Sequence, residues 1–157
     1  MINNIDDKNN IALYTALLKK HGNSFKTLNW GSKESQVLRF KVLAEIGLSP
    51  SDSVLDVGCG LGDFFQWLEE NIASIDYSGI DITPGMIETA SLRYPNTNFL
   101  EGAIEDAVSE SQKFDFVMAS GIFAHRKQQP VDFLYKSILQ MYSKSRKGVA
   151  FNCLSDW

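Results

Sequence analysis

The residues best suited to chemistry are carboxylates beside a glycine-rich segment. Residues 54–64 read VLDVGCGLGDF, so Asp56 lies two residues before the first glycine and Asp63 directly follows the third. Glycines after a buried strand allow a tight turn and a close approach of the backbone to a ligand. The third glycine of a nicotinamide-dinucleotide fingerprint would fall at Asp63, and carboxylates here would repel a pyrophosphate. The pattern favours a ligand with an ammonium or sulfonium charge; the alternative is that Asp56 only accepts backbone N–H groups of the turn.

A second carboxylate ends the next hydrophobic segment, Gly79-Ile80-Asp81-Ile82, 19 residues after Gly62. A carboxylate at the tip of a strand at this separation can accept both hydroxyls of a ribose. The alternative is that Asp81 caps the following helix. Thr83 is better placed as that N-cap, with Pro84 at the first helical position, so we favour ribose binding.

Helices and strands must alternate to position these groups. The periodicity and the capping residues predict helices at 8–20, 32–46, 61–71, 83–94 and from 130 onward, with Leu134, Ile138, Met141 and Tyr142 facing inward on the last. Strands are expected at 53–57, 74–81, 98–101, 114–119 and 148–153. This order predicts an α/β fold whose parallel sheet carries helices on both faces. Ligands of such sheets bind beyond the carboxyl ends of the strands.

Composition restricts the class of protein. The 157 residues correspond to one domain, and the net charge of −4 argues against a nucleic-acid partner. No apolar run approaches the length of a membrane span, and the N-terminal residues lack the pattern of a signal peptide. We therefore expect no membrane partner and a cytoplasmic location.

The segments 54–64, Gly79–Asp81 and Phe114–Val117, at their separations, resemble the class I S-adenosylmethionine-dependent methyltransferases. The resemblance covers residues 32–153. It implies a Rossmann-like, doubly wound sheet of order 3-2-1-4-5 in a single domain, with residues 1–47 as a helical cover and 48–157 as the cofactor-binding core. It also implies S-adenosylmethionine as cofactor and S-adenosylhomocysteine as product.

The same resemblance assigns roles to residues. Asp56 and the loop Gly58, Cys59, Gly60 and Gly62, with Asp63, would face the methionine end. Asp81 would bind the ribose, and Ile82 and Met86 would pack on the ribose and adenine. Ala103 stands where many members carry Asp, so recognition of the adenine amino group falls to Glu105, Asp106 or the backbone. Ile104 would pack against the adenine ring, and Ser120 would contact the cofactor from the end of the fourth strand. We expect Gly60→Val to block the ligand and to leave the fold largely intact.

The N-terminal segment resembles the cover of one branch of this family. Trp30 would close the site, and Arg39, which shares a helix face with Gln36, would pair with the cofactor's carboxylate. The alternative is a core tryptophan and a solvated arginine.

The acceptor side carries few signals. The segment after the fourth strand lacks the Asn/Asp-Pro-Pro-aromatic motif of enzymes that methylate nucleobases, and no metal-ligand spacing occurs, so we expect a small-molecule acceptor. His125 is the candidate general base; the alternative is a surface histidine. Three functions stay open: a small-molecule methyltransferase, a domain that binds the cofactor without turnover, and an oxidoreductase, which the two carboxylates disfavour.

Only Leu154–Trp157 follow the fifth expected strand, whereas the resembling family adds two further strands there. That strand would lie at the edge of the sheet with unpaired backbone groups, and native proteins usually cover such an edge. We therefore expect either a truncated chain or a homodimer that pairs through the edge of the fifth strand.

Overall fold

A single parallel sheet organises the chain. The computed structural model describes residues 5–124 and 128–153. Across them the strands are β1 (Ser53–Val57), β2 (Asp76–Asp81), β3 (Asn98–Glu101), β4 (Phe114–Ala119) and β5 (Ser145–Phe151). They lie in the order β3-β2-β1-β4-β5, and each neighbouring pair is parallel. The predicted α/β fold and strand order are confirmed.

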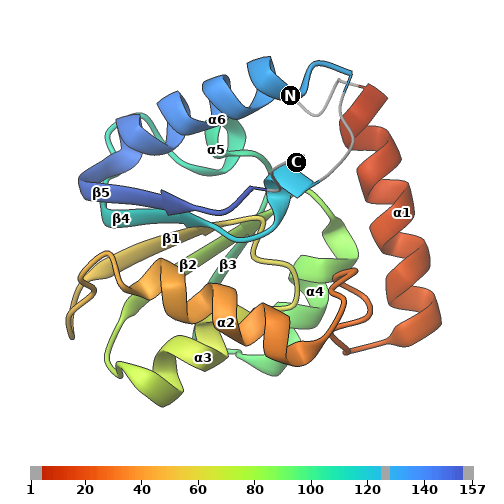
Figure 1. Ribbon diagram of the computed structural model, residues 1–157, viewed down its shortest axis with the longest axis horizontal. Helices are drawn as coiled ribbons and strands as arrows, with labels where there is room; N and C mark the ends of the chain where they lie inside the picture. The colour runs from red at the N-terminus through yellow and green to blue at the C-terminus, as the bar shows by residue number, and fades with distance from the viewer. Residues whose placement is uncertain (1–4, 125–127, 154–157) are drawn as a thin grey trace.

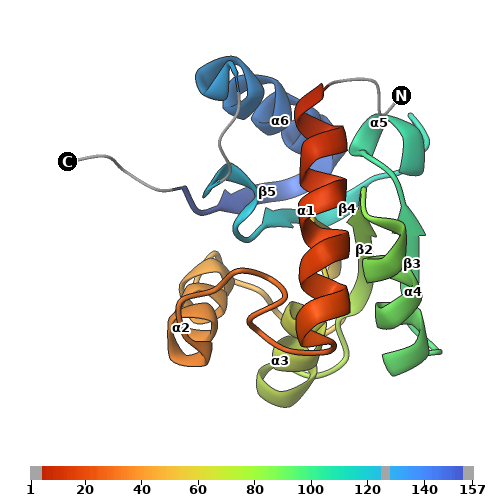
Figure 2. The ribbon, with the colours of Figure 1, turned by 90° about the vertical axis from the view of Figure 1, so that its right-hand side faces the viewer.

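Helices cover both faces of the sheet. They are α1 (Ile5–His21), α2 (Lys33–Ala44), α3 (Asp63–Asn71), α4 (Pro84–Arg93), α5 (Ile104–Ala107), α6 (Pro130–Lys144) and the 3-10 turn η1 (Ile122–Ala124). The helices α2, α3 and α4 lie on one face, and α5 and α6 lie on the other (Figure 1). Figure 2 shows α1 standing across the carboxyl ends of the strands. No helix among the described residues is long and apolar enough to cross a membrane.

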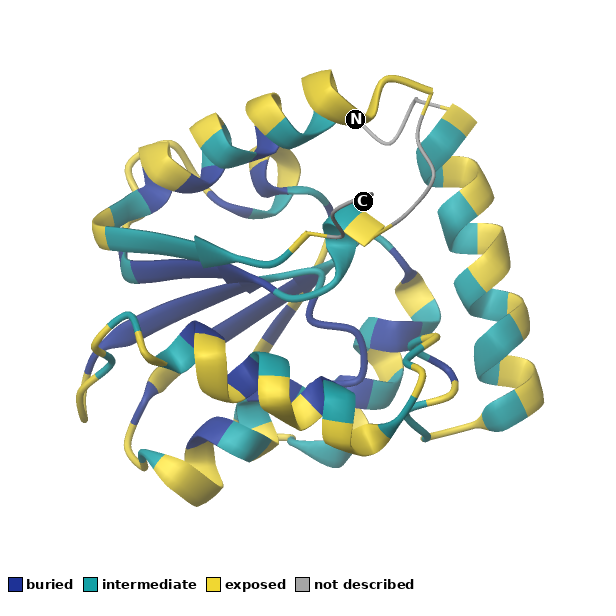
Figure 3. Ribbon diagram, in the orientation of Figure 1, coloured by how far each residue is buried: buried dark blue, intermediate teal, exposed yellow. Residues whose placement is uncertain are grey.

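Alternation along the strands builds one core on each face. Successive side chains of a strand point to opposite faces, so Val54 joins the core under α2 and α3, whereas Leu55 joins the core under α5 and α6. Both side chains are fully buried, and the central strands form the buried centre of the molecule in Figure 3. The strand ends that carry Asp56 and Asp81 are therefore held by packing from two sides.

The last strand differs from the prediction. It begins at Ser145, directly after α6, rather than at Gly148, and it ends at Phe151, before Cys153. The early start has a physical cause, because Arg146 donates to Asp115 and Lys147 contacts Asp52 and Asp115. These ion pairs fasten the polar first residues of β5 to its neighbours.

One inward-facing residue of α6 was predicted wrongly. Tyr142 is 71 % exposed, whereas Ser137, Met141 and Lys144 are buried. These three residues are spaced by four and three, which places them on one face of the helix. The ammonium of Lys144 is satisfied by the carbonyls of Val108 and Ser109, so this charged residue takes the buried position.

Candidate functional site

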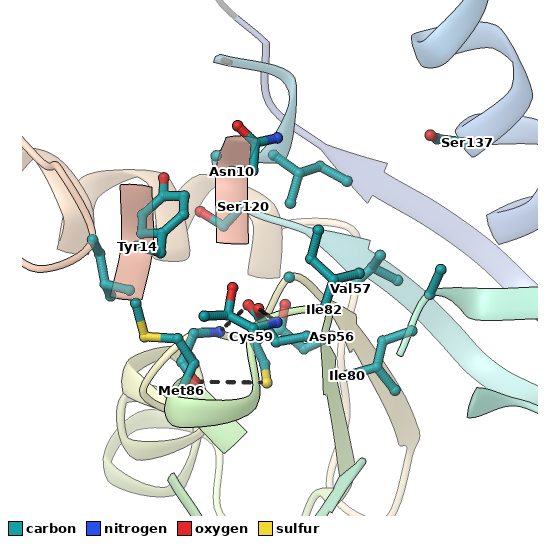
Figure 4. A pocket seen from close by; sticks show the side chains of 18 of the residues that line it. Asn10, Tyr14, Asp56, Val57, Cys59, Ile80, Ile82, Met86, Ser120 and Ser137 are labelled. Atoms are coloured by element: carbon teal, nitrogen blue, oxygen red, sulfur yellow. Dashed lines mark hydrogen bonds between the residues drawn. The ribbon is translucent and has the colours of Figure 1, made fainter. Parts of the chain in front are cut away.

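A cavity of about 440 Å³ opens at the carboxyl ends of the strands (Figure 4). Its floor is the loop after β1 and the tip of β2, and its walls come from α4 and the loops after β3 and β4. Residues of α1 close it from above, and residues of α6 form its far side. This is the place where the topology predicted a ligand.

Of the cofactor contacts predicted from the sequence, all but Gly62, Arg39 and Asp106, the alternative to Glu105, line the cavity. The lining ones are Trp30, Asp56, Gly58, Cys59, Gly60, Asp63, Asp81, Ile82, Met86, Ala103, Ile104, Glu105 and Ser120. The candidate base His125 lies outside the described residues.

Asp81 occupies the tip of β2 and is bonded on both oxygens. One oxygen accepts the backbone N–H of Gly60 at 3.0 Å, and the other accepts that of Thr83 at 2.8 Å. Thr83 is the N-cap of α4 and Pro84 begins the helix, as expected, although the Thr83 hydroxyl makes no capping bond to the helix. Burial raises the pKa of Asp81, and the two backbone N–H groups oppose that rise. Asp81 thus faces the cavity and also organises its floor.

Asp56 is a buried carboxyl group at the end of β1. The hydroxyl of Tyr77 on β2 donates a hydrogen bond to it at 2.7 Å. Burial raises the pKa of Asp56 to about 7, against the opposing effect of the Tyr77 hydroxyl, and the nearby charge of Asp81 adds to the rise. Among the described residues, no backbone N–H of the turn donates to Asp56, so the alternative role expected for it is not seen. The hydrogen bond from Tyr77 thus fixes this carboxyl group at the wall of the cavity.

The glycine loop follows a left-handed path that glycine adopts without strain. Gly58, Gly60 and Gly62 have φ of +77°, +55° and +78°. A Cβ built on Gly58 would lie 2.2 Å from Ile122, and one on Gly60 would lie 2.6 Å from Leu28. The expectation that a side chain at Gly60 would meet only the ligand is therefore wrong, since the protein itself covers this loop.

Asp63, the first residue of α3, is already paired. Arg93 of α4 forms a salt bridge with it at 2.7 Å, and the amide of Gln36 donates to its other oxygen at 3.1 Å. Gln36 is buried and lines the cavity. Asp63 therefore presents an oriented and partly neutralised carboxylate.

Arg39 takes a different place from the one expected. Its guanidinium stacks over the ring of Trp30, 4.8 Å from the ring centroid, and does not reach the cavity. Gln36, one turn earlier on α2, lines the cavity instead. Trp30 itself lines the cavity and lies against Gly121 of the loop after β4.

Two groups of lining residues were missed by sequence reasoning. On α1 they are Asp7, Asn10 and Tyr14, and on α6 they are Phe133, Lys136, Ser137 and Gln140. The spacing of the α1 residues by three and four was a usable signal, because it places them on one helix face. Figure 4 shows Asn10 and Tyr14 above Asp56 and Cys59. Burial, together with the charge of Asp81, raises the pKa of Tyr14 to about 12.

Glu105, which the resemblance places near the adenine, has a hydrogen-bond partner within the chain. Gln140 of α6 donates to the carboxylate of Glu105 at 3.0 Å. Ile104 is buried and lines the cavity. Across the described ranges, no group of three histidine, cysteine or acidic residues is arranged to hold a metal ion.

Comparison with known proteins identifies the family. The profile of the family described as "Methyltransferase domain" matches residues 54–144, more than half of the chain. The chain belongs to the class I S-adenosylmethionine-dependent methyltransferases. Binding of S-adenosylmethionine and S-adenosylhomocysteine is typical of this class.

Curated relatives of this chain are longer proteins. It is 32 % identical over 112 residues to Rv1506c of Mycobacterium tuberculosis, a match that covers 67 % of this chain and 64 % of that protein. It is 34 % identical over 74 residues to the ubiquinone/menaquinone biosynthesis C-methyltransferase UbiE of Campylobacter jejuni, covering 43 % of this chain and 31 % of UbiE. The chain thus spans less than two thirds of the length of each of these relatives.

Solved structures share the fold at low identity. DesVI of Streptomyces venezuelae superposes with a TM-score of 0.63 at 17 % identity, over 85 % of this chain and 57 % of DesVI. A Geobacter sulfurreducens methyltransferase in complex with S-adenosylhomocysteine gives a TM-score of 0.61 at 19 % identity, over 86 % and 51 % of the two chains. At these identities the likeness shows the fold alone.

Proposed function

We propose that the cavity binds S-adenosylmethionine and that the chain transfers its methyl group to a small-molecule acceptor. The observation that carries this proposal is the position of Asp81, a buried carboxylate at the tip of β2, bonded to the glycine loop and facing the cavity. A carboxylate in this place can accept the hydroxyls of a ribose. The bound cofactor would supply a methyl group already activated on a sulfonium.

The residues present fit that cofactor along its whole length. Asp56 and Asp63 offer negative charge for its ammonium and sulfonium groups, and Ile82, Met86 and Ile104 offer apolar walls for its adenine. The described lining carries five acidic side chains and a single lysine, which favours a cationic ligand and disfavours a pyrophosphate. Holding an acceptor in line with the methyl group is the main task left for the protein, because positioning alone is worth about 7–11 kcal/mol in favourable cases.

A binding experiment tests the cofactor assignment. Calorimetric titration with S-adenosylhomocysteine should give a saturable isotherm, whereas titration with NAD should give none. Binding of NAD in preference to S-adenosylhomocysteine would reverse the assignment in favour of an oxidoreductase.

A second experiment tests turnover. Incubation with methyl-labelled cofactor and a panel of small hydroxyl-, amine- and carboxylate-bearing molecules should label one chemical class of acceptor. The acidic cavity lining and the net charge of −4 disfavour nucleic acid, which serves as the negative control. Binding without labelling of any acceptor would favour the alternative function, a domain that binds the cofactor as a sensor or partner subunit.

We further infer that residues 1–47 act as a cover over a core formed by 48–157 within one domain. The support is that α1 contributes Asp7, Asn10 and Tyr14 to the cavity while its Leu18 packs beside Gly85 of α4. A chain lacking α1 should keep the fold of the sheet and bind S-adenosylhomocysteine more weakly.

We also propose a homodimer through the edge of β5. In the described ranges β5 pairs with β4 alone, and the outer face of α6 exposes Val131, Tyr135, Leu139 and Tyr142. The chain rises about 3.3 Å per residue along a strand and about 1.5 Å per residue along a helix. Gly148 on β5 and Ser137 on α6 therefore both lie about 11 Å along their elements from the turn that joins α6 to β5. One two-fold axis can therefore pair the β5 strands antiparallel and set Tyr135 of one α6 against Leu139 of the other.

Light scattering after size exclusion tests the dimer. Tyr135→Glu should convert it to monomer, whereas Leu92→Glu, at a residue of α4 that is also strongly exposed, should not. A monomeric wild-type chain at about 100 µM, well above the dissociation constants of stable dimers, would contradict the proposal.

A further inference from the structure

A polar network braces the glycine loop from outside the cavity, and Arg93 is its centre. Arg93 is the last residue of α4 and does not line the cavity. Its Nη1 donates to the carbonyl of Leu61 at 2.5 Å and to Oδ1 of Asp63 at 2.7 Å. One guanidinium thus holds the loop backbone and the first side chain of α3 together.

The other oxygen of Asp63 is held from the opposite side. Nε2 of Gln36 donates to Oδ2 of Asp63 at 3.1 Å, and Gln36 is 3 % exposed. The Asp63 carboxylate lies between a guanidinium and an amide that come from different helices, so its orientation is fixed. It is 19 % exposed and lines the cavity.

Arg93 is itself held in place. Its guanidinium lies 4.9 Å from the ring centroid of Tyr94, and its Nη2 reaches Oε1 of Gln66 at 3.4 Å. The hydroxyl of Tyr94 donates to the same Gln66 oxygen at 3.1 Å, and the Tyr94 ring lies against Gly62. The brace therefore touches the loop at Leu61, Gly62 and Asp63.

We propose that Arg93 is a positioning residue for the amino-acid end of the cofactor, acting through Asp63 and the carbonyl of Leu61. This inference rests on the proposed binding of S-adenosylmethionine. A pre-oriented carboxylate attracts an ammonium without losing rotational freedom on binding, which is the general advantage of preorganisation. The proposed adenine and ribose contacts, at Ile104 and Asp81, make no described hydrogen bond to Arg93 or Asp63, so we expect them to be largely retained without Arg93.

Two ligands separate this role from simple support of the fold. S-adenosylhomocysteine carries the amino-acid end, and 5′-methylthioadenosine has the same adenosine and thioether but lacks it. In Arg93→Gln we expect the dissociation constant of S-adenosylhomocysteine to rise about tenfold, as for loss of one charge-assisted contact, while that of 5′-methylthioadenosine changes less than twofold. Arg93→Lys, which keeps the charge but loses the fork of donors, should lie between wild type and Arg93→Gln.

Asp63→Asn provides a second variant should Arg93→Gln fold poorly, and it should show the same preference for weakening S-adenosylhomocysteine. Combining the two substitutions should weaken binding little beyond either alone, because both act on one contact. Arg146→Gln removes a different ion-paired arginine, at the far end of the sheet, and is the matched control.

The outcomes are distinct. Equal loss of both ligands in Arg93→Gln and Asp63→Asn, or unchanged binding of S-adenosylhomocysteine, would overturn the role assigned to Arg93. If the wild-type chain binds neither ligand, the proposed function fails, and that result is visible before any variant is made.

Discussion

The carboxylate of Asp81 accepts the backbone N–H of Gly60 at 3.0 Å, so the tip of β2 is bonded to the glycine loop that follows β1. Its second oxygen accepts the backbone N–H of Thr83 at 2.8 Å. The Thr83 hydroxyl is a further hydrogen-bond donor to this carboxylate. Because the two oxygens together carry about four lone pairs, acceptor capacity remains for a hydroxyl of a ligand. One residue therefore shapes the loop and, in the proposed function, also binds the ribose.

Asp81→Asn should weaken S-adenosylhomocysteine binding by about 1–3 kcal/mol, because a buried acceptor of ligand hydroxyls is lost. The amide side chain also turns an N–H toward one of the two backbone donors, so the melting temperature should fall as well. Asp81→Ala should weaken binding at least as much. Calorimetry and thermal unfolding measure the two effects separately.

The matched control is Asp76→Asn, at the exposed first residue of the same strand. It should leave affinity and melting temperature within error of wild type. Normal affinity in Asp81→Asn would remove Asp81 from the binding site.

Gly60 tests how closely the protein covers the loop. Gly60→Ala introduces a Cβ at φ +55°, 2.6 Å from Leu28. The left-handed conformation alone costs about 1–2 kcal/mol for a residue other than glycine, so both stability and cofactor affinity should fall. In Gly60→Ala/Leu28→Ala the steric part should be relieved and part of the stability recovered by thermal unfolding. A double variant less stable than the sum of its parents would argue against the Leu28 contact.

The sheet and its ligand edge were predictable because local signals were strong there. Buried runs such as Phe114–Ala119 and the glycine-rich turn after Val57 mark strands and their ends, and these bounds match the structure. Asp56 and Asp81 follow from the same logic, since strand ends in a parallel sheet meet at one edge. The prediction succeeded where position along a strand decides position in space.

Side chains that reach the site from helices were harder to place. Arg39 and Gln36 share a helix face. Their spacing in the sequence could not show that the Arg39 guanidinium would stack on Trp30 while Gln36 lines the cavity. The short α5 was missed because four residues carry no periodic pattern. Which residues of α6 line the cavity depends on the rotation of that helix about its own axis against the sheet, and no local feature of the sequence determines this rotation.

Cofactor binding should depend on pH through Asp56. Burial raises the pKa of this carboxyl group to about 7, so it binds a proton as the pH falls below neutrality. The ammonium group of S-adenosylhomocysteine favours the ionised form of Asp56, so affinity for this ligand should fall between pH 8 and pH 5. The fall should be at most about tenfold per pH unit, the limit for a single linked proton. Calorimetry across this range, in buffers of different ionisation enthalpy, measures both affinity and proton release.

Asp56→Asn should bind more weakly at pH 8 and lose most of this pH dependence. The raised pKa of Asp81 provides a second titrating carboxyl group in the cavity, so Asp81→Asn should retain the part that belongs to Asp56. A flat profile in the wild-type chain would show that Asp56 does not meet the charged part of the ligand.

The ion cluster at the other end of the sheet predicts loss of stability in acid. Hydrogen bonds from Ser53, with Arg146 and Lys147 nearby, lower the pKa of Asp115 to about 2, and Lys147 holds the pKa of Asp52 below its usual range. A carboxyl group with a lowered pKa in the folded state stabilises the fold above its unfolded pKa of about 3.9, and this stabilisation is lost as the pH falls toward 2.

Asp115→Asn should therefore lower the melting temperature at pH 7 by several degrees, since hydrogen bonds to a charged group are worth about 1.5–3 kcal/mol. The difference from wild type should shrink as the pH falls from 4.5 to 2.5. Glu110→Gln, an exposed residue of the loop before β4, is the control and should melt like wild type throughout. A difference that stays constant across this range would exclude a charge-dependent contribution.

Tyr14 tests whether α1 forms a wall of the site. Burial and the charge of Asp81 raise its pKa to about 12, so the phenol keeps its proton near neutrality and can donate to a ligand. Tyr14→Phe should weaken S-adenosylhomocysteine binding by about 0.5–1.5 kcal/mol, the net worth of one hydrogen bond, and Tyr14→Ala should weaken it further by opening the cavity. Because every residue of α1 is described and each of its side chains stays partly exposed in the free protein, the melting temperature of the free protein should change little. Leu13→Ala, at the adjacent and more exposed position, should bind like wild type, and normal affinity in both Tyr14 variants would place the ligand away from α1.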